Sequence, residues 1–173
     1  SSATGSFTVG IEGDNTVVST AADETFALGA GNDTVVFSQN LAVYNATFLG
    51  GGVVEVSGPD GTDTLSDVEM LEFADTVLLI VDAAGEYGSF TTIQAAVDFA
   101  RANPGHHTIM VRDGDYSLTS TLTLDFGVTI IGESEAGVQI NASSVSGYGI
   151  LVSGDGVSLG NFTLQGPAAD VGS

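Results

Sequence analysis

Acidic and amide side chains recur every nine residues near the start of this sequence. Asn15, Glu24 and Asp33 each stand directly before a threonine, which a short apolar run follows. Carboxylate and amide oxygens are ligands that Ca²⁺ takes in proteins, so these residues are candidate calcium ligands. The alternative is that they only hold tight turns, which Asp and Asn do well without a metal.

The spacing belongs to a nine-residue repeat. Residues 11–19, 20–28 and 29–37 read IEGDNTVVS, TAADETFAL and GAGNDTVVF. A polar turn followed by a short apolar strand is the unit of a parallel β-roll. The repeat resembles the RTX-like (haemolysin-type) calcium-binding nonapeptides of bacterial secreted toxins and proteases, whose pattern is GGxGxDxUx. The resemblance is strongest where Gly29 and Gly31 precede Asp33.

That resemblance carries an expectation about the metal. In the family, the aspartate and turn carbonyls bind calcium and two nonapeptides complete one coil, so ligands recur every eighteen residues. Asn15 would then lie beside Asp33, whereas Glu24 would lie beside Ala42. We therefore expect at most one calcium site of this type, at Asp33.

A second segment, residues 58–79, resembles a structural module found beside such repeats. A GxDTL turn at residues 61–65 precedes an E-x-L-x-F-x-D strand. Alternation predicts that Leu71 and Phe73 face one side and Glu72 the other. Three aspartates here could form a second oxygen cluster, with an Asp-rich turn as the alternative; they are Asp60, Asp63 and Asp67.

The charge of the chain narrows its partners. Among the 173 residues, 22 are acidic and two are basic, which gives a formal net charge of -20. Such a surface repels phosphate backbones and anionic lipid, so we expect no nucleic-acid partner and no membrane insertion. Divalent cations would relieve the self-repulsion, although acidity can also serve solubility alone. With no cysteine, we expect a secreted or cell-surface bacterial protein.

The periodicity changes after residue 90. Apolar residues at helical spacing predict one amphipathic helix over residues 91–103; they are Ile93, Ala96, Val97 and Ala100. Residues 91–94 have the form of a capping box, from Thr91 to Gln94. The Asn-Pro-Gly sequence at 103–105 predicts the end of the helix. We expect a surface loop at His106 and His107 rather than a metal pair, because adjacent side chains diverge.

Short strands separated by Gly, Asp and Ser turns are predicted after the helix, at residues 108–111, 122–124, 128–131, 138–140, 149–152, 157–159 and 162–164. Val128 and Ile150 are 22 residues apart, and Val138 and Val157 are 19 apart. These spacings indicate coils of about twenty residues.

Residues 85–165 resemble the entry of the pectin-lyase-like right-handed β-helix superfamily. The motifs are the helix FTTIQAAV, then TIMVRDGDY, then GVTIIG. The fold class we expect is all-β. It comprises a β-solenoid, a right-handed parallel β-helix with one N-terminal cap helix, preceded by a small β-roll-like domain. The expected domains are residues 1–82 and residues 83–173, the second truncated.

Catalytic residues are not assigned. Members of the β-helix superfamily include polysaccharide lyases, epimerases and esterases, and the fold alone does not decide among functions. The only basic residues apart from histidine are Arg101 and Arg112, and the later strands offer no carboxylate pair for acid–base chemistry.

The function we expect is that of a calcium-associated β-solenoid module. Its role is structural, adhesive or glycan-recognising, within a larger or self-assembling surface protein. Its expected partners are calcium and an acidic or neutral polysaccharide. Since no second amphipathic helix appears in residues 162–173, self-association through an uncapped last coil is also expected. The alternative is the N-terminal part of a polysaccharide lyase, epimerase or esterase whose active site lies beyond residue 173.

Overall fold

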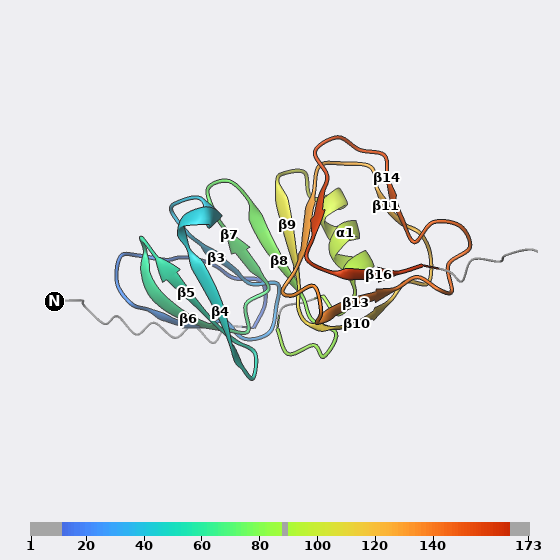
Figure 1. Ribbon diagram of the computed structural model, residues 1–173. Helices are drawn as coiled ribbons and strands as arrows, with labels where there is room; N and C mark the ends of the chain where they lie inside the picture. Colours follow the sequence, from blue (N-terminus) through green and yellow to red (C-terminus); the bar gives the residue numbers. More distant parts are fainter. Residues whose placement is uncertain (1–11, 88–89, 167–173) are drawn as a thin grey trace, which may run out of the picture. The chain divides into compact units, whose positions relative to one another are not determined.

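A computed structural model of the protein describes residues 12–87 and 90–166 (Figure 1). Residue 11, which opens the first nonapeptide, and residues 167–173, at the expected uncapped end, lie outside the described residues. The chain forms two compact units, one of residues 1–80 and 84–89, the other of residues 81–83 and 90–173. Apart from one α-helix and one 3-10 turn, every described element is a strand, so the predicted all-β class is confirmed.

The nonapeptides of the first unit form short parallel strands. They give β1 (Thr16–Val18), β2 (Thr25–Ala27) and β3 (Thr34–Val36), and later residues add β6 (Gly61–Ser66) and β7 (Met70–Glu72). β3 pairs in parallel with β1 on one side and β7 on the other, while β2 pairs in parallel with β6. In chain order these five strands therefore alternate between two sheets.

An insertion separates β3 from β6. It consists of η1 (Leu41–Val43), β4 (Asn45–Gly50) and β5 (Val53–Gly58), and β5 pairs antiparallel with both β4 and β6. In Figure 1 these strands lie side by side. Tyr44 of the insertion packs against Phe37 and Phe73 at ring-centroid distances of 5.3 and 5.1 Å. This aromatic contact fixes the insertion to the strands around it.

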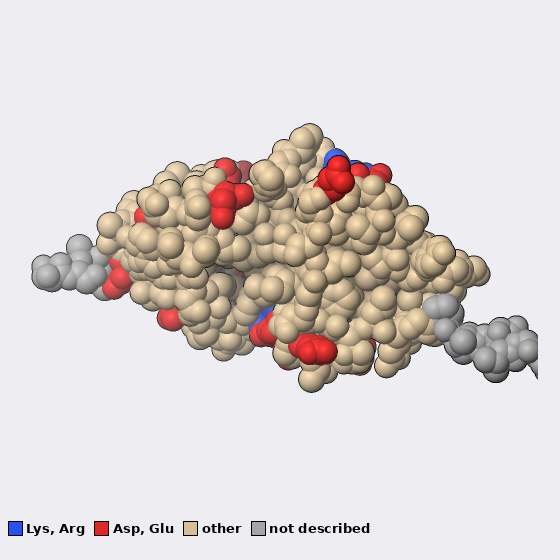
Figure 2. All heavy atoms as spheres, turned by 45° about the horizontal axis from the view of Figure 1, so that its top comes forward, with Lys and Arg blue, Asp and Glu red and all other residues tan. Residues whose placement is uncertain are grey.

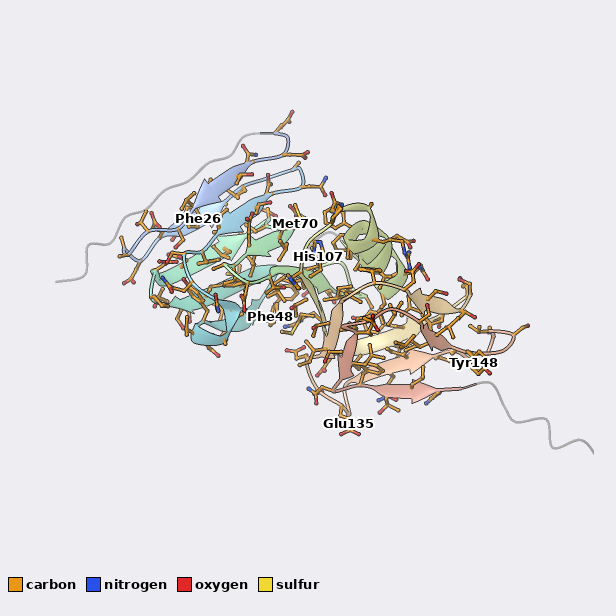
Figure 3. All side chains as sticks on the ribbon, turned by 90° about the horizontal axis from the view of Figure 1, so that it is seen from above. Phe26, Phe48, Met70, His107, Glu135 and Tyr148 are labelled. Atoms are coloured by element: carbon orange, nitrogen blue, oxygen red, sulfur yellow. The ribbon has the colours of Figure 1, made fainter. Side chains whose placement is uncertain are left out.

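The core of the first unit follows the period-two alternation of its strands. Leu71 and Phe73 are buried and Glu72 between them is exposed, as predicted. Phe26, labelled in Figure 3, is also buried. β8 (Val77–Val81) pairs antiparallel with β7, and its apolar residues are almost all buried. Burial of these side chains supplies the main favourable contribution to the stability of this unit.

The second unit begins with the predicted helix, α1 (Ile93–Ala102), which buries the predicted apolar face. The capping box was wrong by one residue. The N-cap is Thr92, whose hydroxyl accepts a 3.2 Å hydrogen bond from the backbone N–H of Ala95, and Gln94 instead bonds Asp98.

The expected surface loop was also wrong at His107, which begins a strand and is buried against the helix end. Its Nε2 lies 2.6 Å from the carbonyl oxygen of Asn103.

Eight short strands follow α1 and form three parallel sheets. They are β9 (His107–Val111), β10 (Gly114–Ser117), β11 (Leu122–Leu124), β12 (Thr129–Gly132), β13 (Val138–Asn141), β14 (Ile150–Val152), β15 (Ser158–Gly160) and β16 (Thr163–Gln165). The pairings are β9 with β12 and β12 with β15, then β10 with β13 and β13 with β16, then β11 with β14.

The coil spacings inferred from Val128 with Ile150 and from Val138 with Val157 were wrong. β12 instead pairs with β15 and β13 with β16. Each set of three strands passes to the next through turns of different lengths, so partners lie 21 residues apart for Thr108 and Thr129 but 29 apart for Thr129 and Ser158. Apolar residues stack inward from strand to strand, for example Tyr116 beside Ile140.

None of the helices in the described residues is both long and apolar enough to cross a membrane.

Candidate functional site

Two turns of the first unit brace each other through side-chain to backbone hydrogen bonds. Oδ1 of Asp14 accepts from the backbone N–H of Asn32 at 2.9 Å. In the opposite direction, Oδ1 of Asp33 accepts from the backbone N–H of Asn15 at 2.7 Å and from its Nδ2 at 3.1 Å. Asn15 thus lies beside Asp33, as the eighteen-residue spacing predicts, and donates to the aspartate in this structure.

A second pair of turns repeats this arrangement. The backbone N–H of Thr62 donates to Oδ1 of Asp23 at 3.0 Å, and the backbone N–H of Glu24 donates to Oδ1 of Asp63 at 2.9 Å. The expectation that Glu24 lies beside Ala42 was therefore wrong. After β3 the chain forms the insertion of η1, β4 and β5 before it adds the next strand beside β2. The turn that stacks on Glu24 therefore contains Asp63, not Ala42. The carboxylate of Glu24 holds its own turn by accepting from the backbone N–H of Thr20 at 2.7 Å.

Gly29 and Gly31 shape the first pair of turns. Gly29 has a φ of 89°, a conformation that favours glycine. A Cβ at Gly31 would lie 2.6 Å from the carbonyl carbon and oxygen of Gly13, so the close approach of the two turns requires glycine there. Both glycines therefore have a structural reason that does not depend on a metal.

Hydrogen-bond donors satisfy both carboxylate oxygens of Asp60 and of Asp63, so neither aspartate needs a cation for compensation. Asp63 is fully buried, and its second oxygen accepts from the Ser19 hydroxyl at 2.5 Å. Burial raises the pKa of Asp63. Asp60 accepts from the Ser38 hydroxyl and backbone N–H, each at 2.7 Å, and from the Tyr44 hydroxyl at 2.5 Å. Burial opposes ionisation of Asp60, but these hydrogen bonds outweigh it and lower its pKa.

Asp33 differs from those two aspartates because one of its carboxylate oxygens accepts no hydrogen bond. Its side chain is fully buried, and Oδ2 has no hydrogen-bond partner among the described residues. A buried anionic oxygen without a donor is costly unless a cation compensates it. The unpartnered Oδ2 therefore makes Asp33 a candidate cation ligand.

Glu69 is a carboxylate that contacts the backbone of Asp33. Its Oε2 accepts a 2.7 Å hydrogen bond from the backbone N–H of Asp33. Burial raises the pKa of Glu69; the charge of Asp33 adds to the rise, and that of Asp67 contributes less. Sequence reasoning did not include Glu69 among the candidate ligands. Glu69 stands directly before β7 as Asn15 and Asp33 stand directly before β1 and β3, but this equivalence depends on the pairing of β7 with β3.

The remaining ligands of a calcium ion at Asp33 would have to be other oxygens. Calcium takes six to eight oxygen ligands, including carbonyls and water. No group of three or more His, Cys, Asp or Glu side chains is arranged to hold a metal within residues 12–87 and 90–166. On the face drawn in Figure 2 the acidic side chains likewise form separate patches. Asp33 and Glu69 would thus contribute the charge of the site, with neutral oxygens completing it.

Both arginines of the second unit are used in ion pairs. Arg101 lies 2.9 Å from Asp98 and 3.1 Å from Asp125, and Arg112 lies 3.1 Å from Glu133. The pair of Arg101 with Asp125 joins α1 to the turn after β11. The pair of Arg112 with Glu133 joins the turn after β9 to the turn after β12. The arginines therefore have structural contacts, and no acid–base pair is assigned to them.

Comparisons of the chain with protein-family models, with curated proteins and with solved structures find no match in any of the three.

Proposed function

We propose that the chain is a calcium-associated β-solenoid module of a secreted or cell-surface bacterial protein, with a structural, adhesive or glycan-recognising role. The observation that carries the calcium part is the buried, unpartnered Oδ2 of Asp33 beside the carboxylate of Glu69. A cation there would compensate two carboxylates that the fold brings together. It would also reduce the self-repulsion of a chain with a net charge of -20.

The solenoid part is supported by the parallel, in-register pairing in both units. In a solenoid each repeat contacts mainly its neighbours, and equivalent residues stack. In the first unit, Thr16 pairs with Thr34 and Thr25 with Thr64, each directly after a braced turn. Two strands per coil there resemble an RTX-like β-roll.

In the second unit, three strands per coil and a preceding helix resemble a pectin-lyase-like β-helix. A turn between coils supports this proposal. Asn161 has a φ of 63°, and its Nδ2 donates to the carbonyl oxygen of Gly132 at 2.8 Å. Since Asn161 directly follows β15 and Gly132 ends β12, this bond joins equivalent turns of neighbouring coils.

Thermal unfolding tests the calcium part. A ligand that binds only the folded state raises Tm as its concentration increases. We expect the Tm of the full chain to rise from excess chelator to millimolar CaCl2, with a smaller rise in MgCl2 because Mg²⁺ demands a stricter geometry. An unchanged Tm across the calcium series would eliminate the calcium proposal.

A second candidate is self-assembly through the last described strands. Val152, Leu159 and Leu164 continue the inward rows of the second unit, but they are 48%, 39% and 43% exposed. Residues 136–166 contain a single acidic residue, Asp155, in a chain that is otherwise strongly acidic. Two copies can meet most readily where their charges are fewest. Sedimentation over a range of protein concentrations tests this candidate, and a monomer at every concentration would contradict it.

A further inference from the structure

The outer face of the sheet β10-β13-β16 carries two straight rows of polar side chains. Alternation points Tyr116, Ile140 and Leu164 inward, so their strand neighbours lie on the outside. The register aligns these outer residues across the three strands. The first row is Asp115, Gln139 and Thr163, and the second row is Ser117, Asn141 and Gln165. Neighbouring members of a row are about 4.8 Å apart, the spacing of paired strands.

The rows offer hydrogen-bonding groups with little charge. One carboxylate stands among amides and hydroxyls, and neither row contains a basic residue. Short hydrogen bonds orient two of the amides: Nε2 of Gln139 donates to the carbonyl oxygen of Ala136, and Oδ1 of Asn141 accepts from the backbone N–H of Ser143, each at 2.9 Å. The other polar atom of each amide remains available to a ligand.

A groove continues the rows at the β10 edge. It has a volume of about 460 Å³ and is lined by residues from the start of α1 and from β10 with its following turn. Its polar lining is hydroxyl, amide or carboxylate, mostly from Thr91, Thr92, Gln94, Asp115, Ser117 and Ser120. Apolar surface is added by Ala83, Ile93 and Leu118. Asp115 and Ser117 belong both to the groove and to the rows, so the two features form one surface, which we call the polar face.

The chemistry of the polar face fits a hydroxylated polymer. Protein interfaces bury an apolar centre, and the outward residues of these three strands supply none. Anionic glycans meet a carboxylate here without any Lys or Arg, on a chain with a net charge of -20. An uncharged polysaccharide, with regularly spaced hydroxyl donors and acceptors, matches rows of amides and hydroxyls at a regular spacing.

We infer that the polar face binds an uncharged polysaccharide along the direction of its two rows. This inference rests on the proposed glycan recognition and names its surface and ligand class. Tyr148, labelled in Figure 3 and 71% exposed, lies in the loop that joins β13 to β14.

Affinity electrophoresis of the full chain tests the inference. The chain is run with calcium through gels that contain xylan, galactomannan, a mixed-linkage glucan or polygalacturonate. We expect at least one of the three neutral polysaccharides to slow the chain, and polygalacturonate not to slow it. Retardation by none of the neutral polymers, or by polygalacturonate alone, would overturn the inference.

Variants locate the binding surface. Gln139→Ala combined with Asn141→Ala should weaken binding of the neutral polymer about tenfold, since two hydrogen bonds to ligand are lost. Ser158→Ala, an exposed polar residue of β15 in a different sheet, is the matched control and should leave binding unchanged. Equal affinity of the double variant and the control would place binding elsewhere.

A blocking variant covers the case in which the double variant is less stable. Ser117→Trp adds bulk to the exposed polar face without removing a side-chain hydrogen bond that joins the described strands, and it should also abolish retardation. The calcium-dependent Tm of the same samples separates the two proposals. Absent retardation with an intact calcium shift would contradict the glycan site alone, and retardation without a calcium shift would contradict the calcium site alone.

Discussion

The backbone N–H of Asp33 donates a 2.7 Å hydrogen bond to Oε2 of Glu69, and this bond brings two carboxylates of stacked turns together. The same relation holds one turn earlier, where the backbone N–H of Asn15 donates to Asp33. In both cases a carboxylate accepts a hydrogen bond from the backbone of the preceding turn in the stack. Acidic residues thus stabilise the stack locally, although their charges repel.

Removing the buried carboxylate of Asp63 should destabilise the first unit strongly. Asp63→Ala removes the acceptor of the Glu24 backbone N–H and the short hydrogen bond of the Ser19 hydroxyl, which keeps only a 3.4 Å contact with the carbonyl oxygen of Asp60. At about 1–3 kcal/mol for each of these two groups, we expect a loss of about 2–6 kcal/mol in the free energy of unfolding. Urea denaturation measures this loss. Asp23→Ala removes the equivalent but exposed bond to Thr62 and should cost about 1 kcal/mol or less; equal losses in the two variants would contradict the expectation.

Asp63 should also make stability depend on pH. Because burial raises its pKa above the ordinary 3.8, the folded state binds the proton more tightly than the unfolded state. The free energy of unfolding contributed by this group therefore falls as pH rises through the range just above 3.8. Asp63→Asn has no proton to lose and should lack this fall. Urea denaturation at several values between pH 3 and pH 7 compares the two proteins, and parallel stability curves would show that Asp63 does not titrate in this way.

We predict that the hydroxyl of Thr92, and not that of Thr91, stabilises the N-terminus of α1. Thr92→Ala removes the hydroxyl that accepts from the backbone N–H of Ala95, and we expect a loss of about 1 kcal/mol in the free energy of unfolding. The neighbouring Thr91→Ala is the control and should change stability by less than about 0.5 kcal/mol. Denaturation curves of the two variants decide between them. A larger loss for Thr91→Ala would favour the capping box expected from the sequence.

Local sequence patterns predicted where the helix and most strands lie better than they predicted which strands pair. The spacing of Ile93, Ala96, Val97 and Ala100 located α1, because burial of one helix face repeats every three to four residues. β10 was not among the predicted strands, because Tyr116 is the only large apolar residue in its four. A strand can be predicted from sequence only where adjacent residues show an apolar pattern. β10 lacks that pattern and forms a strand by pairing with β13.

The candidate site shows the same limit. Asn15 and Asp33 could be placed together because no insertion lies between them. Glu24 and Asp63 could not, since the length of the inserted β4 and β5 hairpin has no counterpart in the nine-residue period. Glu69 was recognised as part of a strand motif, but its place above Asp33 becomes visible only when β7 pairs with β3.

Calcium titration of the wild-type chain and of Asp33→Asn, by calorimetry with Tm in parallel, tests whether Asp33 binds calcium. The amide introduced by Asp33→Asn can still accept from Asn15 but offers no unpaired anionic oxygen, so without calcium we expect a Tm no lower than that of the wild type. With calcium, the wild type should show saturable binding and a rising Tm; at a concentration one hundred times Kd the gain is about 2.7 kcal/mol. Asp33→Asn should show neither, while Asp14→Asn, in the braced partner turn, should keep both. Absence of binding by the wild type, or equal binding by Asp33→Asn, would rule out a calcium site at Asp33.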